Sequence, residues 1–371
     1  MYKLFTSRIK KLKSFLNKKE LQNILIFSDV NIFYLTGFYG KDSASLLLIT
    51  NDCLYLLVSF IYLEQARKSV QIKDINVVCY QRDKFKKLAK ILENYSFSSI
   101  GIDAKNISLA GFRKLEKSLA GQGKRLVSID GAVENLRIVK DKLEISKIKN
   151  ACKITDKVFG SIIGSGAAAV NKLSEIELAF KIEELMVKSN SEGRAFDTIA
   201  AYGKNSSMPH YSPQKIKVRD GLILMDFGCK FENYCSDMTR TIFTGNQKIC
   251  NEFKKIYDIV LKAQMMAIEN CREGVTCSQL DRIARKFIAS KGYGSNFGHG
   301  LGHGVGIEVH EEPAVTMGNR TVLRENMVIT IEPGIYIENF GGVRIEDMVI
   351  VKKNGCEVLY NSKKSFLILD R

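Results

Sequence analysis

The sequence predicts a two-domain protein of mixed α/β (α+β) class, with one domain at residues 1–134 and a second at residues 135–371. A chain of 371 residues usually forms two domains, and 45% hydrophobic with 26% charged residues is typical of globular proteins. The first region alternates short apolar runs with lysine-bearing helical stretches, which is an α/β pattern. The second region shows the same order of helices and strands twice, which suggests a duplicated architecture.

The first domain is expected to begin with an amphipathic helix and to continue as strands and helices. In "MYKLFTSRIKKLKSFLNKKE", apolar side chains recur at helical spacing at Phe5, Ile9, Leu12 and Leu16, with lysines mostly between them. We expect this helix to pack on its own domain. Strands are expected at "NILIF", "ASLLLIT", "CLYLLV" and "INVVCY", and a helix is expected at "DKFKKLAKILENY".

The second domain is expected to contain two pairs of helices. Asp141 and Glu144 form a capping signal at the start of the first helix, and the second begins at Ser174. The third helix is expected to begin near residue 248 and the fourth near Ser278. Strands are expected to follow each pair.

These strands carry four acidic residues. "GLILMDFGCKFENYCSDMTRTIFTG" predicts two strands joined by a polar turn, so that Asp226 and Asp237 face each other across the hairpin. Glu332 ends the apolar strand of "VITIEPGIY", and Glu346 lies in another, with Arg344 on the same face. Four carboxylates brought together would repel until some took up protons, whereas two divalent metal ions would balance them.

The histidines are also clustered. Three of the four lie in "FGHGLGHGVGIEVHEEP", at His299, His303 and His310, among five glycines that let groups approach the backbone closely. The fourth, His210, lies sixteen residues before Asp226, so we expect every histidine to belong to one site. A single imidazole in a carboxylate-rich set suits Mn²⁺, Co²⁺, Fe²⁺ or Zn²⁺ and argues against a structural zinc site, which would use cysteine.

Charge and cysteine content limit the possible partners. A net charge of +16 is compatible with nucleic-acid or anionic-membrane binding, but lysines occur throughout the chain and predict a solvated surface. Because there is neither a known reader motif nor an apolar segment of about 20 residues, we expect no specific nucleic-acid partner and no membrane. Nine cysteines without a C-x-x-C pair predict reduced thiols in a cytoplasmic protein.

Several of these motifs together resemble the dinuclear-metal pita-bread peptidases, which include Xaa-Pro aminopeptidase, Xaa-Pro dipeptidase (prolidase) and methionine aminopeptidase. "MDFG", "SDMTRT", "GHGVGIEVHEEP", "TIEPGIY" and "GGVRIED" occur in the order of that family across residues 135–371. "VNIFYLTGFYGKDSASLLLIT" and "YLEQA" are similar to the creatinase-like amino domain of the proline-specific branch. One departure lies at Ser59 to Tyr62, where relatives usually carry an Asp and an Arg before the Tyr.

The resemblance implies a pita-bread catalytic domain with duplicated helix-helix-hairpin halves, and it implies roles for individual residues. Two divalent metal ions, with Mn²⁺ expected, would be bound by Asp226, Asp237, His303, Glu332 and Glu346. His310 would hydrogen-bond the scissile carbonyl, and His210 would contact substrate. His299 would be the extra histidine of the proline-specific branch. Tyr336 and Arg344 match positions that contact the ligands or the substrate.

The implied reaction is hydrolysis of the peptide bond before proline, which releases the N-terminal residue from Xaa-Pro peptides or dipeptides. The resemblance also implies that the protein is a homodimer. Water activated by the cations would attack the carbonyl, and Glu332 would pass its proton to the proline nitrogen. A methionine aminopeptidase-like exopeptidase is disfavoured by the additional N-terminal domain and the second histidine of "GHGLGHG". A non-catalytic pita-bread binding protein, or creatinase-like hydrolysis without metal, is disfavoured because all five ligands are present. Dipeptides and longer peptides both remain possible substrates.

Overall fold

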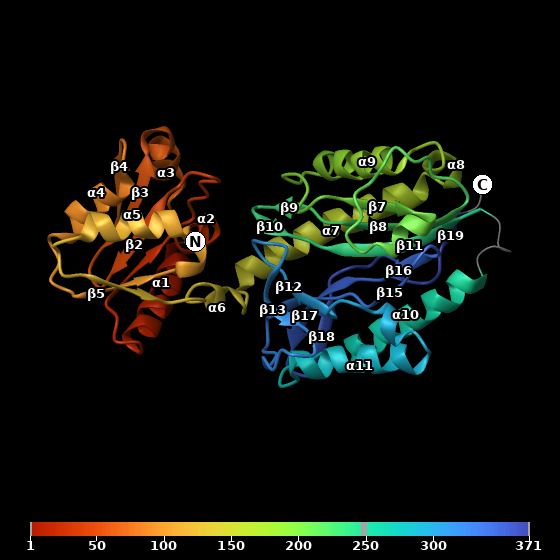
Figure 1. Ribbon diagram of the computed structural model, residues 1–371. Coiled ribbons are helices and arrows are strands. Elements are labelled where there is room, and N and C mark those ends of the chain that lie inside the picture. The colour runs from red at the N-terminus through yellow and green to blue at the C-terminus, as the bar shows by residue number, and fades with distance from the viewer. Residues whose placement is uncertain (1, 246–250, 370–371) are drawn as a thin grey trace. The chain divides into compact units, whose positions relative to one another are not determined.

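The computed structural model (Figure 1) describes residues 2–245 and 251–369, and the chain divides into two units, Met1–Arg137 and Ile138–Arg371. In the described part of the first unit, six strands form one mixed sheet, and all four strands expected from apolar runs are present. The order across this sheet is β4 (Ile75–Tyr80), β3 (Leu54–Ser59), β2 (Leu46–Thr50), β1 (Asn23–Ile26), β5 (Ser99–Ile102) and β6 (Arg125–Ser128).

Helices flank this sheet. They are α1 (Tyr2–Asn17), α2 (Asp29–Thr36), α3 (Leu63–Ser69), α4 (Lys84–Leu92), α5 (Leu109–Leu119) and α6 (Glu134–Arg137), with 3-10 turns at Phe60–Tyr62 and Ala104–Asn106. The predicted amphipathic helix is confirmed as α1, which packs against α2 and β1. Its apolar side chains, Phe5, Ile9, Leu12 and Leu16, are at most 7% exposed. The stripe is therefore part of the core of the first unit.

The second unit contains two larger sheets in its described residues. One has the order β19 (Ile368–Leu369), β11 (Met238–Thr244), β8 (Gly221–Phe227) and β7 (Ile199–Tyr202). The other has the order β13 (Glu311–Val315), β12 (Gly302–Gly304), β14 (Val328–Ile331), β17 (Asp347–Lys352) and β18 (Gly355–Val358). Two small hairpins complete it, formed by β9 (Lys230–Phe231) with β10 (Tyr234–Cys235) and by β15 (Gly334–Ile337) with β16 (Gly341–Arg344).

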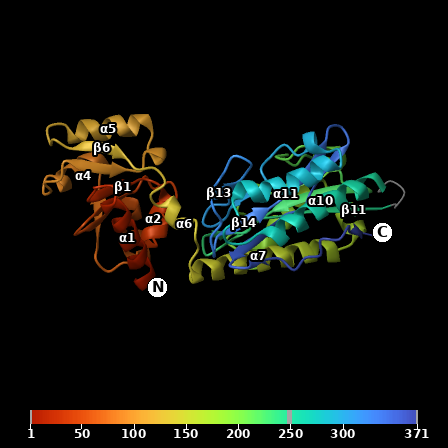
Figure 2. The same cartoon turned by 90° about the horizontal axis from the view of Figure 1, so that it is seen from below.

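Long helices cover these sheets in pairs. They are α7 (Lys142–Gly164), α9 (Glu175–Lys188), α10 (Asn251–Asn270) and α11 (Cys277–Ser290), with the short α8 (Ala167–Val170) and 3-10 turns at Gly203–Ser207 and Gly294–Asn296. Figure 1 shows α7 and α9 beside the β7–β8–β11 sheet, and Figure 2 shows α10 and α11 side by side. The mixed α/β class and the two helix-and-sheet halves are thus confirmed.

Capping residues fix where these helices begin. Asp141, Ser174 and Thr276 each accept a hydrogen bond from a backbone N–H of the first turn and form a full capping box. The first two caps are the predicted ones, and the fourth helix begins one residue before the predicted Ser278. The expected start near residue 248 lies outside the described residues. Among the described helices, each is too short or too polar to cross a lipid bilayer.

Candidate active site

The expected metal ligands lie in or directly beside strands of the second unit. Asp226 is the penultimate residue of β8, and His303 is the middle residue of β12. Glu332 directly follows β14, as predicted. Asp237 lies in the gap between β10 and β11, and Glu346 lies between β16 and β17, so the prediction that both lie inside strands is wrong. Carboxylates are disfavoured in paired strand interiors, and breaks in the ladder accommodate them.

The register of β8 and β11 refines the expected aspartate pair. Asp226 lies directly opposite Thr239, two residues beyond Asp237. Asp237 is therefore a diagonal neighbour of Asp226 rather than its direct partner. Because side chains two residues apart project to the same side of an extended chain, both carboxylates still face the same cavity.

The glycines beside His303 are required by close backbone contacts. A Cβ at Gly302 would lie 2.1 Å from the carbonyl oxygen of Thr330, and one at Gly304 would lie 2.3 Å from that of Glu312. Any larger residue would push β12 away from the strands on both sides. The glycine-rich sequence thus allows His303 to enter a tightly packed sheet and to reach the carboxylates.

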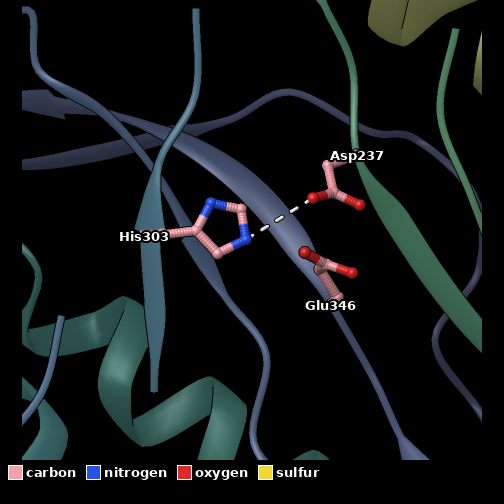
Figure 3. A group of neighbouring side chains, drawn as sticks. All are labelled: Asp237, His303 and Glu346. Carbon is pink, nitrogen blue, oxygen red and sulfur yellow. Dashed lines mark ion pairs between the residues drawn. The ribbon is translucent and has the colours of Figure 1, made fainter. Parts of the chain in front are cut away.

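Three of the expected ligands form a compact group (Figure 3). The ligand atoms of Asp237, His303 and Glu346 all lie within 4.8 Å of one another. His303 Nε2 is 3.6 Å from Asp237 Oδ2. Both carboxylates are nearly inaccessible to solvent, whereas His303 is partly exposed. The group combines one nitrogen with oxygen ligands from two carboxylates, which is a donor set for a divalent transition metal.

Asp226 and Glu332 lie beside this group in the same cavity. Glu332 Oε1 is 3.3 Å from His303 Nε2 and accepts a hydrogen bond from Thr330 Oγ1 at 3.1 Å. Asp226 Oδ2 accepts a hydrogen bond from Arg344 at 2.6 Å, but its other oxygen is buried without a hydrogen-bond partner among the described residues. A buried carboxylate oxygen without a partner fits a position that binds a cation.

The electrostatics of the cavity also favour the binding of cations. Burial raises the pKa of Asp237 well above its usual range, and the charges of Glu346 and Asp226 raise it further. Burial, with Glu332 and Asp226, likewise raises the pKa of Glu346. Protein groups alone therefore do not compensate these carboxylates in their charged form. Divalent cations fit the set because they would supply the missing positive charge.

Arg344 links several of these residues through hydrogen bonds. Its Nη2 donates to Asp226, and its Nε donates to Thr239 Oγ1 at 2.9 Å. Thr239 in turn donates to Glu346 Oε2 at 2.7 Å. Arg344 Nη1 donates to the hydroxyl of Tyr336 at 2.8 Å. The arginine thus orients carboxylates from two different sheets through direct and relayed hydrogen bonds.

All four histidines line one cavity of about 440 Å³. The rings of His303 and His310 are 4.3 Å apart between centroids, and burial together with the charge of His303 lowers the pKa of His310. His299 Nε2 lies 3.0 Å from the Tyr336 hydroxyl, and His210 is exposed at the cavity wall. The structure thus brings together all the site residues expected from sequence.

Several residues that shape this cavity are not among those expected from the sequence. Thr239 and Thr330 hydrogen-bond to the carboxylates of the expected ligands Glu346 and Glu332, and each threonine is two residues from an acidic residue, at Asp237 and Glu332. Since alternate residues of an extended chain share a face, this spacing could have indicated that both threonines face the site. Apolar wall residues gave no comparable signal because they come from distant segments; they include Phe196, Ile199, Tyr211 and Val309.

The fold and this carboxylate-rich cavity define a metal-dependent hydrolytic enzyme. Residues 146–353 match the model of metallopeptidase family M24, and residues 8–139 match the creatinase/prolidase N-terminal domain. The chain belongs to metallopeptidase family M24, so it is a peptidase that uses divalent metal ions, and the resemblance noted in its motifs is confirmed.

Similar proteins cover nearly the whole chain. An Xaa-Pro dipeptidase of Pyrococcus horikoshii is 37% identical over 98% of this chain and 99% of its own length. The solved structure of an Xaa-Pro dipeptidase from Bacillus anthracis has a TM-score of 0.92 at 32% identity, covering 98% of this chain and 100% of that one. An X-Pro aminopeptidase from Thermotoga maritima has a TM-score of 0.88 at 35% identity, covering 97% and 99%.

Proposed function

We propose that the chain hydrolyses the peptide bond that precedes proline and releases the N-terminal residue from Xaa-Pro peptides or dipeptides. The observation that carries the proposal is one cavity that holds the five expected metal ligands together with His210, His299 and His310. The activities named for the similar dipeptidases and aminopeptidase support the same substrate class.

We propose that two divalent ions, with Mn²⁺ preferred over Co²⁺, Zn²⁺ or Fe²⁺, are bound by Asp226, Asp237, His303, Glu332 and Glu346. An oxygen-rich set with one imidazole supports Mn²⁺. When bound, the ions supply Lewis-acid polarisation of the scissile carbonyl and make water acidic enough to attack near neutral pH.

The side chains around the ligands would supply hydrogen bonds and proton transfer. His310 lies at the cavity wall beside His303, and a neutral imidazole there can donate a hydrogen bond to the carbonyl oxygen as negative charge develops on it. Glu332 would accept the proton of the attacking water and deliver it to the leaving nitrogen. Thr330 donates to Glu332 and orients its carboxylate for this task.

Proline recognition would depend on shape rather than on an amide hydrogen bond. The nitrogen of an Xaa-Pro bond carries no hydrogen, so a pocket cannot select it through an N–H donor. Apolar side chains at the cavity wall, from Phe196, Ile199, Tyr211 and Val309, offer a surface on which the pyrrolidine ring can pack. His210 also lines this cavity and would contact the substrate backbone.

The experiment that tests this function compares matched peptides with the purified, Mn²⁺-reconstituted protein. We expect hydrolysis of Met-Pro and Met-Pro-Ala and little hydrolysis of Met-Ala and Met-Ala-Ala, measured by release of free methionine. The ratio of the two proline substrates separates a dipeptidase from an aminopeptidase. Equal or faster cleavage of the alanine peptides, or no cleavage of either proline peptide, would contradict the proposal.

We also propose that the enzyme acts in the cytoplasm as a homodimer. The eight cysteines in the described residues are free thiols, which supports a reducing compartment. Light scattering of the purified chain tests the assembly, since a monomer at micromolar concentration would contradict it.

A further inference from the structure

Helix α11 directs two charged side chains, Asp281 and Arg285, at the segment that carries His299. Arg285 donates from Nε and Nη2 to the two carboxylate oxygens of Asp281, at 2.8 and 2.9 Å, and the Asp281 side chain is fully buried. Arg285 also donates to the carbonyl oxygens of Phe297 at 2.8 Å and His299 at 2.7 Å. Asp281 accepts from the backbone N–H of Leu301 at 3.1 Å. This ion pair therefore holds three backbone groups around His299.

The same arginine also contacts the side chains of this segment. Its guanidinium lies over the Phe297 ring, 4.2 Å from the centroid. The Phe297 ring in turn meets the His299 ring edge to face, with centroids 5.1 Å apart and an interplanar angle of 88°. Arg285 thus restrains the backbone of His299 directly and its ring through Phe297.

The partners of the His299 ring specify one tautomer. His299 Nδ1 lies 2.8 Å from the carbonyl oxygen of Gly300, which can only accept, so Nδ1 carries a hydrogen. His299 Nε2 lies 3.0 Å from the Tyr336 hydroxyl, which already accepts a hydrogen bond from Arg344. The hydroxyl proton then has Nε2 as its acceptor. A neutral ring with hydrogen on Nδ1 satisfies every donor and acceptor in this chain of contacts.

This assignment limits what His299 can do in the cavity. Both ring nitrogens are engaged by protein groups, so neither a free lone pair nor a free N–H is available to a peptide. Burial also lowers the pKa of His299, which agrees with a neutral ring. His299 nevertheless lines the cavity. Its contribution must come from the position of the ring rather than from proton transfer.

We propose that Asp281 and Arg285 are positioning residues for the peptidase reaction: they hold the neutral His299 ring against Tyr336 as a fixed wall of the substrate cavity. The kinetic part of this proposal rests on the proposed function. The structural part, the tautomer and the hold on the ring, is independent of substrate.

The tautomer can be tested by NMR because the chain has only four histidines. We expect histidine-selective ¹⁵N labelling of the protein loaded with diamagnetic Zn²⁺ to show one ring, identified by its loss in His299→Ala, with hydrogen on Nδ1 alone at neutral pH. Arg285→Gln should move the ring signals of His299 or mix its tautomers. Arg282→Gln, an exposed arginine on the same helix, should leave them in place. A His299 ring with hydrogen on Nε2, or unchanged in Arg285→Gln, would overturn the proposal.

The kinetic test is a double-mutant cycle on Met-Pro and Met-Pro-Ala. Arg285→Gln should lower kcat/KM about 10- to 100-fold with metal content retained, since small misplacements in an active site cost rates of this order. In a His299→Ala background the same substitution should change kcat/KM less than about two-fold, because nothing remains to be positioned. An equal loss in both backgrounds would show a general structural role and would contradict the proposal.

One further variant, Arg285→Lys, keeps the outcomes separate. Arg285→Lys retains the charge beside Asp281 but cannot make the same forked contacts, so it should give an intermediate loss in kcat/KM if Arg285→Gln proves poorly folded. Wild-type activity in Arg285→Lys would count against the proposal. If the wild-type protein cleaved no proline peptide, the proposed function would fail, while the NMR result would still decide whether Arg285 holds His299.

Discussion

Two adjacent buried carboxylates, Glu346 and Asp347, have opposite electrostatic surroundings. Asp347 is fully buried and accepts from Arg240 at 2.8 Å and Lys364 at 2.6 Å. Burial alone would raise the pKa of Asp347, but these two cations lower it on balance. Glu346 lies with Asp237 in the ligand group, and burial and neighbouring carboxylates raise its pKa well above the usual range.

The comparison distinguishes a carboxylate whose charge the fold itself balances from carboxylates whose charge must be balanced by a cation from solution. The fold provides its own cations for Asp347, as buried ion pairs need. For the cavity carboxylates it provides His303, which faces Asp237 and Glu332, and Arg344. Among the contacts of the described residues, Arg344 donates to Asp226 and not directly to Asp237 or Glu346. Substitutions in the two places should therefore have different consequences, one for metal binding and the other for folding.

The largest effect is expected for Asp237→Asn. This change removes a negatively charged ligand from the compact group, so metal and activity should be lost together. Metal catalysis lowers the activation barrier by several kcal/mol, which corresponds to about 10³-fold or more in rate. Metal analysis with initial rates on Met-Pro tests this expectation. Asp258→Asn, at an exposed position on α10, is the control and should leave both unchanged.

A smaller effect on rate is expected when two histidines are substituted, one expected to bind metal and the other to stabilise the oxyanion. His303→Ala should lose metal occupancy, since His303 is the nitrogen of the ligand group. His310→Ala should retain both ions and lose about 10²- to 10³-fold in turnover, the usual contribution of one donor to a developing oxyanion. A metal-free His310 variant, or a His303 variant with both ions and full activity, would show that the roles are assigned wrongly.

On the structural side, Asp347→Asn should destabilise the fold. It leaves Arg240, whose side chain is 1% exposed, without its carboxylate. Removing one partner of a buried ion pair typically costs about 3–5 kcal/mol in free energy of unfolding, which denaturant titration can measure. The matched surface change Asp258→Asn, in an exposed pair with Lys254, should cost less than about 1 kcal/mol. Similar costs for the two variants would contradict the distinction.

The residues expected as ligands lie in one cavity, and the sequence could predict that grouping because charged residues in apolar runs and clustered histidines are local signals. It also indicated that glycines beside His303 permit close approach, and the contact a Cβ at Gly302 would make with Thr330 gives the physical reason. The breaks that hold Asp237 and Glu346 could not be predicted, because they depend on how separate strands pair.

The contacts of Asp281 and Arg285 could not be predicted from the sequence, for a different reason. Their i,i+4 spacing is the same as that of ordinary surface ion pairs on helices. Only the tertiary structure shows that Asp281 is buried and that Arg285 reaches the carbonyl of His299. The predicted α1 stripe, by contrast, was recognisable because a core face repeats over several turns.

The smallest expected effect is a pH dependence of the metal-free protein, and its sign follows from the same comparison. Asp237 and Glu346 have raised pKa values in the folded chain, so the folded state binds their protons more tightly than the unfolded state does. Their contribution to stability is complete below the unfolded carboxyl pKa of about 4 and is lost as pH rises through the raised folded values. Asp347 has the opposite sign, because its contribution is lost as pH falls through its lowered pKa.

In the presence of a chelator, the Tm of the wild-type chain should therefore decline as pH rises above the ordinary carboxyl range, and Asp237→Asn should reduce that decline. Metal should reverse the trend, because cations compete with protons for the same carboxylates and bind more tightly as pH rises. Thermal unfolding from about pH 5 to 8, with and without Mn²⁺, measures both slopes. A metal-free Tm that rises across this range in the wild type would mean that the cavity carboxylates are compensated by protein groups, as Asp347 is.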